Sequence, residues 1–206
     1  MSGLFITFEG GDGAGKTTLI DSLASEMNSQ GLEVIKTREP GGSSIGKEIR
    51  DLLLRHYQKT QIRPSTEVML FLADRVQHIE EEIRPAVEAG KIVLCDRFND
   101  STVAYQGYAR GMGMEKIREL CDYVCEGYKP DLTFFLDLDP AIGLERVKNV
   151  GEHDRFEAER VEFHRKVREG FHKIAGAEPE RFHLIDASQS VEDVFLEVLG
   201  FVKAKL

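Results

Sequence analysis

A single glycine-rich segment constrains the fold more than any other part of the sequence: Gly10-Gly11-Asp12-Gly13-Ala14-Gly15-Lys16-Thr17. It matches G-x-x-x-x-G-K-[ST] and stands between a strand-like run at Leu4–Glu9 and a helical pattern from about Lys16 to Gln30. Glycines let successive backbone N–H groups turn toward phosphate oxygens, and the helix N-terminus adds a positive dipole end. We therefore predict a nucleoside triphosphate site, with Lys16 at the β- and γ-phosphates and Thr17 on Mg²⁺. The predicted triphosphate-binding residues are Gly10, Gly11, Asp12, Gly13, Ala14, Gly15, Lys16, Thr17 and Thr18.

Short apolar runs alternate with amphipathic stretches of helical length along the whole chain, which is typical of a parallel sheet with helices on both faces. At 206 residues the chain is long enough for one such domain, covering residues 1–206. Strands are predicted at Leu4–Glu9, Leu32–Thr37, Lys91–Cys95, Asp131–Asp137 and Phe182–Ile185. Helices are predicted at Lys16–Gln30, Gly46–Leu54, Ser65–Glu82, Ala158–Ile174 and Val191–Lys203, with a break or kink near Arg84 because Pro85 follows. Another helix is predicted to lead into Gly143–Lys148, with Asp139 as its N-cap and Pro140 as its first residue. This is the α/β, three-layer arrangement of a P-loop kinase.

Composition excludes several classes of protein. Net charge is −9, from 27 basic and 36 acidic residues, which argues against a nucleic-acid-binding face. The longest apolar runs are far shorter than the roughly 20 residues of a membrane span. Three cysteines, Cys95, Cys121 and Cys125, lack metal-ligand spacing, so we expect buried thiols rather than a zinc or redox site. An odd number of cysteines without an export signal predicts a cytoplasmic protein.

Basic residues outside the P-loop favour a kinase over a GTP-dependent switch. The sequence lacks N-K-x-D and has no D-x-x-G on a second metal-contacting strand. Arginines instead follow predicted strands, where open α/β sheets bind ligands: Arg38, Arg97, and the set Arg146, Lys148 and Arg155. Two phosphate-binding regions imply a donor triphosphate and an acceptor that already carries a phosphate. Such an acceptor is mostly a dianion at neutral pH, so transfer needs arginines and Mg²⁺ rather than a catalytic histidine. We therefore expect the six histidines to lie at the surface.

Several segments together resemble the bacterial thymidylate kinases. They occur in the family's order and spacing over nearly the whole chain: Thr37-Arg38-Glu39-Pro40-Gly41-Gly42, Phe71-Leu72-Ala73-Asp74-Arg75, Asp96-Arg97-Phe98, Ser101-Thr102-Val103-Ala104-Tyr105-Gln106-Gly107, Pro130-Asp131-Leu132-Thr133, Leu136-Asp137 and Asp154-Arg155-Phe156-Glu157. The resemblance implies the reaction ATP + dTMP → ADP + dTDP, with ATP and Mg²⁺ as cofactors, a five-stranded parallel sheet with a short lid at about residues 146–158, and a homodimer.

The resemblance also implies an acceptor pocket. Phe71 would stack on thymine while Arg75 and Gln106 contact the polar edge of the base. Glu39 and Tyr105 would lie on the sugar side, where Tyr105 would exclude a ribose 2′-OH. The implied acceptor residues are Glu39, Arg50, Phe71, Arg75, Arg97, Thr102, Tyr105 and Gln106.

The resemblance also implies which residues contact the phosphates and the metal. Arg50 and Arg97 would hold the dTMP phosphate through their forked guanidinium groups. Asp96 would join Thr17 at the metal, and residues 186–188 would lie along the adenine. The implied catalytic residues are Lys16, Asp96, Arg97 and Arg155.

The chain departs from the family pattern at two places. Phe98 stands where the family usually has Tyr or His, so a hydrogen bond from that position is lost. Val150 stands where a lid arginine is expected before Gly151. Three residues remain as sources of mobile positive charge: Arg146, Lys148 and Arg155.

Two other functions remain open from the sequence. A P-loop kinase for a different acceptor would share the fold; a nucleoside kinase could use Glu39 as a base, but Arg50 and Arg97 would then lack a purpose. A non-catalytic ATP-binding module would tolerate the loss of lid charge at Val150, but would not need Lys16 together with an intact acceptor pocket.

Overall fold

The computed structural model describes residues 3–58, 60–148 and 154–206. Its framework is a five-stranded sheet in the order β2-β3-β1-β4-β5, and all of its paired strands are parallel. The strands are β1 (Leu4–Gly10), β2 (Val34–Arg38), β3 (Ile92–Asp96), β4 (Leu132–Asp137) and β5 (Phe182–Asp186). All five predicted strands are confirmed within one or two residues.

Strand register gathers the chemically important residues at one edge of the sheet. Phe8 of β1 lies opposite Asp96 of β3, and Arg38 of β2 lies opposite the same aspartate. On the other side of β1, Gly10 pairs with Leu136 of β4. The carboxyl ends of the strands therefore place the P-loop beside the polar residues that follow β2 and β3.

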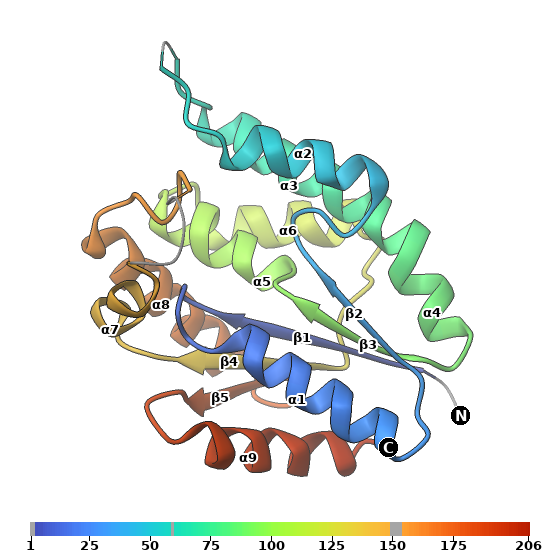
Figure 1. Ribbon diagram of the computed structural model, residues 1–206. Helices are drawn as coiled ribbons and strands as arrows, with labels where there is room; N and C mark the ends of the chain where they lie inside the picture. The colour runs from blue at the N-terminus through green and yellow to red at the C-terminus, as the bar shows by residue number, and fades with distance from the viewer. Residues whose placement is uncertain (1–2, 59, 149–153) are drawn as a thin grey trace.

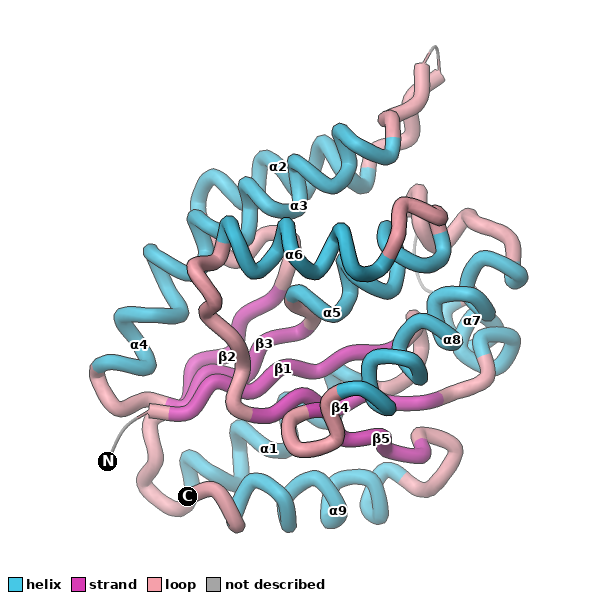
Figure 2. Tube along the Cα trace, turned by 180° about the vertical axis from the view of Figure 1, so that it is seen from behind, coloured by secondary structure: helices cyan, strands magenta, loops and turns pink. Residues whose placement is uncertain are grey.

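Helices cover both faces of the sheet (Figures 1 and 2). Two helices, α1 (Lys16–Ser29) and α9 (Val191–Lys203), lie side by side on one face. The opposite face carries the remaining helical elements, which are α2 (Ser44–Leu54), α3 (Pro64–His78), η1 (Ile79–Ile83), α4 (Arg84–Glu88), α5 (Asn99–Thr102), η2 (Val103–Ala109), α6 (Met114–Val124) and α8 (Val161–Ala177), while α7 (Pro140–Val147) follows β4 near the P-loop. Together the layers form the three-layer fold predicted from the sequence.

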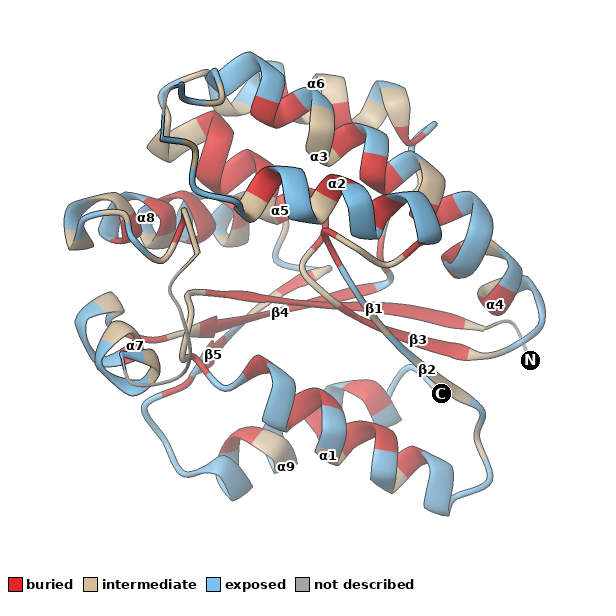
Figure 3. Ribbon diagram, turned by 45° about the horizontal axis from the view of Figure 1, so that its top comes forward, coloured by how far each residue is buried: buried red, intermediate tan, exposed pale blue. Residues whose placement is uncertain are grey.

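The buried residues explain why the central strands are apolar throughout. Leu4, Ile6 and Phe8 of β1 pack into the core beneath α1 and α9, whereas Phe5 packs on the opposite face with Phe98. Figure 3 shows that β1, β3 and β4 are buried along most of their length, while the edge strand β2 is largely not. Burial on both faces is typical of parallel sheets covered by helices.

Helix boundaries show what the sequence patterns captured and what they missed. Ser43 and Asp139 cap α2 and α7 by accepting backbone N–H bonds. The chain does not leave the helical conformation at Pro85; the π-helical segment η1 joins α3 to α4, so the change of geometry comes just before Arg84. The helical segment at residues 99–109 was not predicted. No helix within the described ranges is both long and apolar enough to span a membrane.

Candidate active site

The P-loop connects β1 to α1 through backbone conformations that require glycine. Gly13 and Gly15 have φ angles of 73° and 96°, which other residues rarely adopt. Gly13 also packs closely on α7, because a Cβ atom there would lie 2.2 Å from the carbonyl oxygen of Gly143. These positions therefore explain the glycines of the motif in physical terms.

Lys16 is buried inside this loop. Its Nζ donates hydrogen bonds to the carbonyl oxygens of Gly10 (3.2 Å) and Gly11 (3.1 Å) and lies 4.0 Å from Asp96 Oδ1. Burial lowers the pKa of Lys16, and the nearby Arg97 guanidinium lowers it further, whereas Asp96 raises it. The loop backbone thus holds a cation between the P-loop and the end of β3, where a phosphate chain would meet it.

A cavity of about 730 Å³ runs along the carboxyl ends of the strands. It is lined by the P-loop from Asp12 to Thr18 and by Asp96. All eight predicted acceptor residues also line it: Glu39, Arg50, Phe71, Arg75, Arg97, Thr102, Tyr105 and Gln106. Gly10, Gly11 and Arg155 are not among its lining residues. The fold therefore brings most of the predicted site into one space.

Arg97 joins the two ends of this cavity. It has a φ of 72°, a left-handed conformation that costs a non-glycine residue about 1–3 kcal/mol. Its Nη2 donates to Asp12 Oδ1 of the P-loop at 2.9 Å, and its guanidinium lies 5.3 Å from the Tyr105 ring centroid. Burial opposes ionisation of Asp12, but Arg97 and Lys16 together leave the pKa of this carboxyl below its ordinary value. The strained backbone thus aims a guanidinium at the space between the P-loop and the acceptor pocket.

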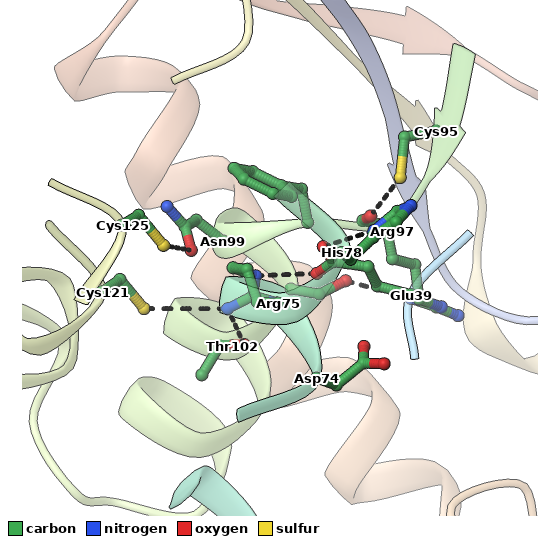
Figure 4. Close-up of polar contacts among 12 residues, drawn as sticks. Glu39, Asp74, Arg75, His78, Cys95, Arg97, Asn99, Thr102, Cys121 and Cys125 are labelled. Carbon is green, nitrogen blue, oxygen red and sulfur yellow. Dashed lines mark hydrogen bonds and ion pairs between the residues drawn. The ribbon is translucent and has the colours of Figure 1, made fainter. Parts of the chain in front are cut away.

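Arg75 is almost completely buried, yet it lines the cavity. Figure 4 shows its polar contacts. Its Nε donates to Glu39 Oε2 at 2.7 Å, and its Nη1 donates to Thr102 Oγ1 at 3.1 Å. Burial lowers the pKa of Arg75, but the Glu39 carboxylate more than offsets this effect and raises it above the ordinary value. Glu39 was expected on the sugar side; in the structure its oxygens face Arg75 and His78. Its observed partners therefore make it an anchor for Arg75.

Aromatic rings and a buried amide form the rest of the acceptor pocket. Phe71 lies 5.9 Å from Phe156, and Tyr105 packs edge-on against Phe156 at 6.1 Å between ring centroids. The Gln106 Nε2 donates to Glu67 Oε1 at 2.8 Å, so this side chain is held from behind. The pocket therefore combines flat apolar surfaces with a fixed polar edge, as a nucleobase requires.

Asp96 has the features expected of a residue near a cation. Its Oδ1 is buried and accepts no hydrogen bond from any residue that the structure describes. Exposed Thr17 lines the same cavity. A carboxylate oxygen and a hydroxyl are hard oxygen donors of the kind that Mg²⁺ prefers. These two residues fit a Mg²⁺ ion bound with the triphosphate.

Comparison with known proteins agrees with this geometry. The family model described as thymidylate kinase matches residues 8–198. The chain belongs to the thymidylate kinase family. A thymidylate kinase from Protochlamydia amoebophila is 50% identical over 210 residues, covering 98% of this chain and 93% of the relative. A thymidylate kinase from Bacillus pumilus is 45% identical over 208 residues, covering 100% of this chain and 98% of the relative. The crystal structure of thymidylate kinase from Ehrlichia chaffeensis has a TM-score of 0.79 at 36% identity, covering 98% of this chain and 99% of that one.

The structure separates the three basic residues that were candidate sources of positive charge, Arg146, Lys148 and Arg155. Arg146 lines the cavity and donates from Nη1 to the Gly13 carbonyl oxygen at 3.1 Å. Arg155 instead pairs with the buried Glu67 at 2.6 Å and donates to the Leu53 carbonyl oxygen. Lys148 is exposed and pairs with Glu145 at 3.4 Å. Val150 lies outside the described residues. Of the three, Arg146 is the one that lines the cavity among the residues that the structure describes.

Buried carboxylates around this thymidylate kinase site were missed by the sequence analysis. Glu9 accepts hydrogen bonds from the Phe98 backbone N–H and the Ser101 hydroxyl, and burial together with Asp100 raises its pKa from 4.5 to about 8. Glu67 joins Gln106 to Arg155. A glutamate next to the P-loop glycine, or in the first turn of a helix, carries no pattern that distinguishes it from a solvated residue.

The expectation that all histidines lie at the surface was wrong. His78 is fully buried and His164 is 5% exposed. His78 contacts Thr37 and Glu39 through its two ring nitrogens, which offset the cost of burying a polar ring. The prediction of buried thiols is confirmed, since Cys95, Cys121 and Cys125 are all free and buried.

Proposed function

We propose that this chain transfers the γ-phosphoryl group of ATP to dTMP, giving ADP and dTDP, with the site residues acting as follows. The observation that carries the proposal is the single cavity with the P-loop at one end and the Phe71, Arg75 and Arg97 pocket at the other. Family membership supports both substrates. The residue roles are those that the family resemblance implies, and the shared cavity lining supports them.

The donor end binds the triphosphate through the P-loop backbone and Lys16. Thr17 and Asp96 would hold Mg²⁺, which would neutralise negative charge on the triphosphate. Ala187, Gln189 and Val191 line the cavity after β5, as expected for the adenine side near residues 186–188. Arg146 supplies further positive charge beside the P-loop.

The acceptor end binds dTMP by its phosphate, base and sugar. Arg50 and Arg97 hold the phosphate, Phe71 stacks on the thymine, and Arg75 donates to its carbonyl edge. Tyr105, buried beside Arg97, occupies the space that a ribose 2′-OH would need. Thr102 and Gln106 complete the polar edge.

Transfer then needs alignment more than acid–base chemistry. An oxygen of the dTMP phosphate attacks the γ-phosphorus, the bond from that phosphorus to the β,γ-bridging oxygen breaks, and ADP leaves with the electron pair. Lys16 and Arg97 flank the path between donor and acceptor and offset the repulsion between the two anions. Aligning the reacting groups is therefore the main contribution of these side chains.

We also propose that the chain forms a homodimer and is cytoplasmic. Exposed apolar residues on neighbouring helices α2 and α3 give a surface suited to a homodimer: Ile45, Leu52, Met69 and Val76. The chain is proposed to form one domain, and its free buried thiols suit a reducing cytoplasm.

A coupled ADP-release assay with ATP–Mg²⁺ tests the proposed reaction. The acceptors are dTMP, dUMP, dCMP, dAMP, dGMP, the ribose analogue of dTMP, and thymidine. We expect a clear preference for dTMP and no turnover of thymidine, which lacks the phosphate held by Arg50 and Arg97. Preference for another monophosphate would overturn the base-pocket assignment, and turnover of thymidine would overturn the phosphate assignment.

A further inference from the structure

Helix α3 presents three buried polar side chains to the segment that follows β2. Asp74, Arg75 and His78 are 0%, 1% and 0% exposed. Figure 4 shows Arg75, His78 and Glu39 converging, with Asp74 nearby on the same helix. Burying so many ionisable groups is costly unless each has a partner, so their arrangement calls for an explanation.

The hydrogen bonds of His78 have a defined direction. Its Nδ1 lies 3.0 Å from Glu39 Oε1, and its Nε2 lies 2.7 Å from Thr37 Oγ1. An ionised Glu39 can only accept, and it already accepts from Arg75 Nε at 2.7 Å. Nδ1 therefore donates to this carboxylate, and in the neutral imidazole Nε2 accepts from the Thr37 hydroxyl. The contacts form one continuous chain from β2 to Arg75.

The same histidine supports the loop after β2, which we define as residues 38–43. A Cβ atom at Gly42 would lie 2.2 Å from His78 Nε2, so the loop backbone rests directly on the imidazole. Next to it, the Gly41 N–H donates to Asp74 Oδ1 at 3.0 Å. On the other side of the loop, Arg50 Nη1 donates to the Pro40 carbonyl oxygen at 2.8 Å. His78 is thus connected to Arg75 through Glu39, and it also packs against the loop that Arg50 contacts.

Arg75 is fixed by several contacts at once. Besides Glu39, it bonds to Thr102 at 3.1 Å and lies 5.1 Å from the Phe98 ring centroid. An arginine can only donate, so a guanidinium held at one place favours a carbonyl oxygen on the base and opposes an amino group there. If the guanidinium could turn away, this discrimination would weaken.

We propose that His78 is a positioning residue for base selection: together with Thr37 and Glu39 it holds Arg75 in the orientation that favours a 4-oxo pyrimidine over a 4-amino pyrimidine. The inference rests on the proposed role of Arg75 in reading the base. His78 does not touch the substrate; it acts through Glu39.

A matched pair of substitutions tests this role. His78→Phe keeps a ring but removes both hydrogen bonds, whereas His78→Asn keeps a donor near the position of Nδ1. We expect His78→Phe to raise the KM for dTMP about tenfold and to lower the dTMP-to-dCMP ratio of kcat/KM by a similar factor, because one buried charge-assisted bond is lost. His78→Asn should recover most of both effects, and the KM for ATP should stay within twofold in each variant. His183→Phe, a change to a partly buried histidine of β5 that stacks on Phe201, is the control and should leave all three values unchanged.

Three outcomes separate this inference from others. Unchanged dTMP kinetics and selectivity in His78→Phe would overturn it, and so would an equal rise in the KM for dTMP and for ATP, which indicates general damage. If His78→Phe does not fold, Thr37→Val provides the test, because it removes only the hydroxyl that orients the ring; an unchanged dTMP-to-dCMP ratio there overturns the proposal. Arg75→Met tests the role of Arg75 separately from that of His78. If this variant leaves the KM for dTMP unchanged, the proposed role of Arg75 itself is wrong.

Discussion

The two ends of the cavity are built in different ways. The core of the donor end is the consecutive segment Gly10–Thr17, which supplies backbone N–H groups, Lys16 and the exposed Thr17. The acceptor end joins side chains that lie far apart in the sequence: Glu39 and Arg75 are 36 residues apart, and Arg75 and Thr102 are 27 apart. Two of its charges, Glu39 and Arg75, form a buried ion pair. The core of the donor end is thus a local motif, whereas the acceptor end depends on contacts made by the tertiary structure.

The largest expected effect is at the donor end. Lys16→Met removes the cation that lies inside the P-loop, and we expect kcat to fall by about 10³-fold because charge on the transferred group is no longer stabilised. Steady-state ADP release measures it. Lys36→Met, which removes a lysine paired with Asp21 at the surface, is the control. A loss smaller than tenfold in Lys16→Met would contradict the assigned role.

At the acceptor end, the largest effect should be on stability. Glu39→Gln leaves the Arg75 guanidinium buried without its carboxylate, and we expect the free energy of unfolding to fall by about 3 kcal/mol. The double variant Glu39→Gln, Arg75→Met should lose less than the sum of the two single changes, because no unpaired charge remains. Urea unfolding of the four proteins measures the cycle. Strict additivity would show that the buried pair is not coupled.

A smaller effect separates Arg146 from Arg155. Arg146→Met should lower kcat on the order of tenfold, since it removes charge beside Gly13 of the P-loop. Arg155→Met should mainly lower stability, because it leaves Glu67 with one cation fewer. Kinetics and thermal unfolding of both variants measure the difference. A larger loss of kcat in Arg155→Met would restore Arg155 as the catalytic lid residue.

The smallest expected effect is a change in pH dependence. Burial and Asp100 raise the pKa of Glu9 to about 8 in the folded protein, whereas the unfolded carboxyl titrates near 4.5. Between these values the folded chain keeps a proton that the unfolded chain has lost, so this stabilisation is complete below pH 4.5 and disappears as pH rises toward 8. Glu9→Gln should make stability fall less steeply over that window, as measured by urea unfolding at several pH values. Identical slopes would show that Glu9 is ionised throughout.

The sequence alone predicted the framework and most of the cavity lining. Apolar runs located the central strands because strands buried on both faces have a strong signal, and short apolar or β-branched runs also located the less buried edge strands. The P-loop needed only its own residues. The family resemblance implied a sugar-side position for Glu39, and His78 was expected at the surface because phosphoryl transfer needs no catalytic histidine. Their roles depend on α3 packing over the loop after β2, which is a long-range contact. The position of Arg155 on Glu67 could not be predicted for the same reason.

Calorimetric titration of dTMP and ATP into the Lys16→Met and Arg75→Met variants tests the separation of the two ends most directly. We expect Arg75→Met to lose affinity for dTMP by about tenfold or more while its ATP affinity stays within twofold. We expect Lys16→Met to lose affinity for ATP while its dTMP affinity stays within twofold. Equal loss of both ligands in either variant would contradict this separation.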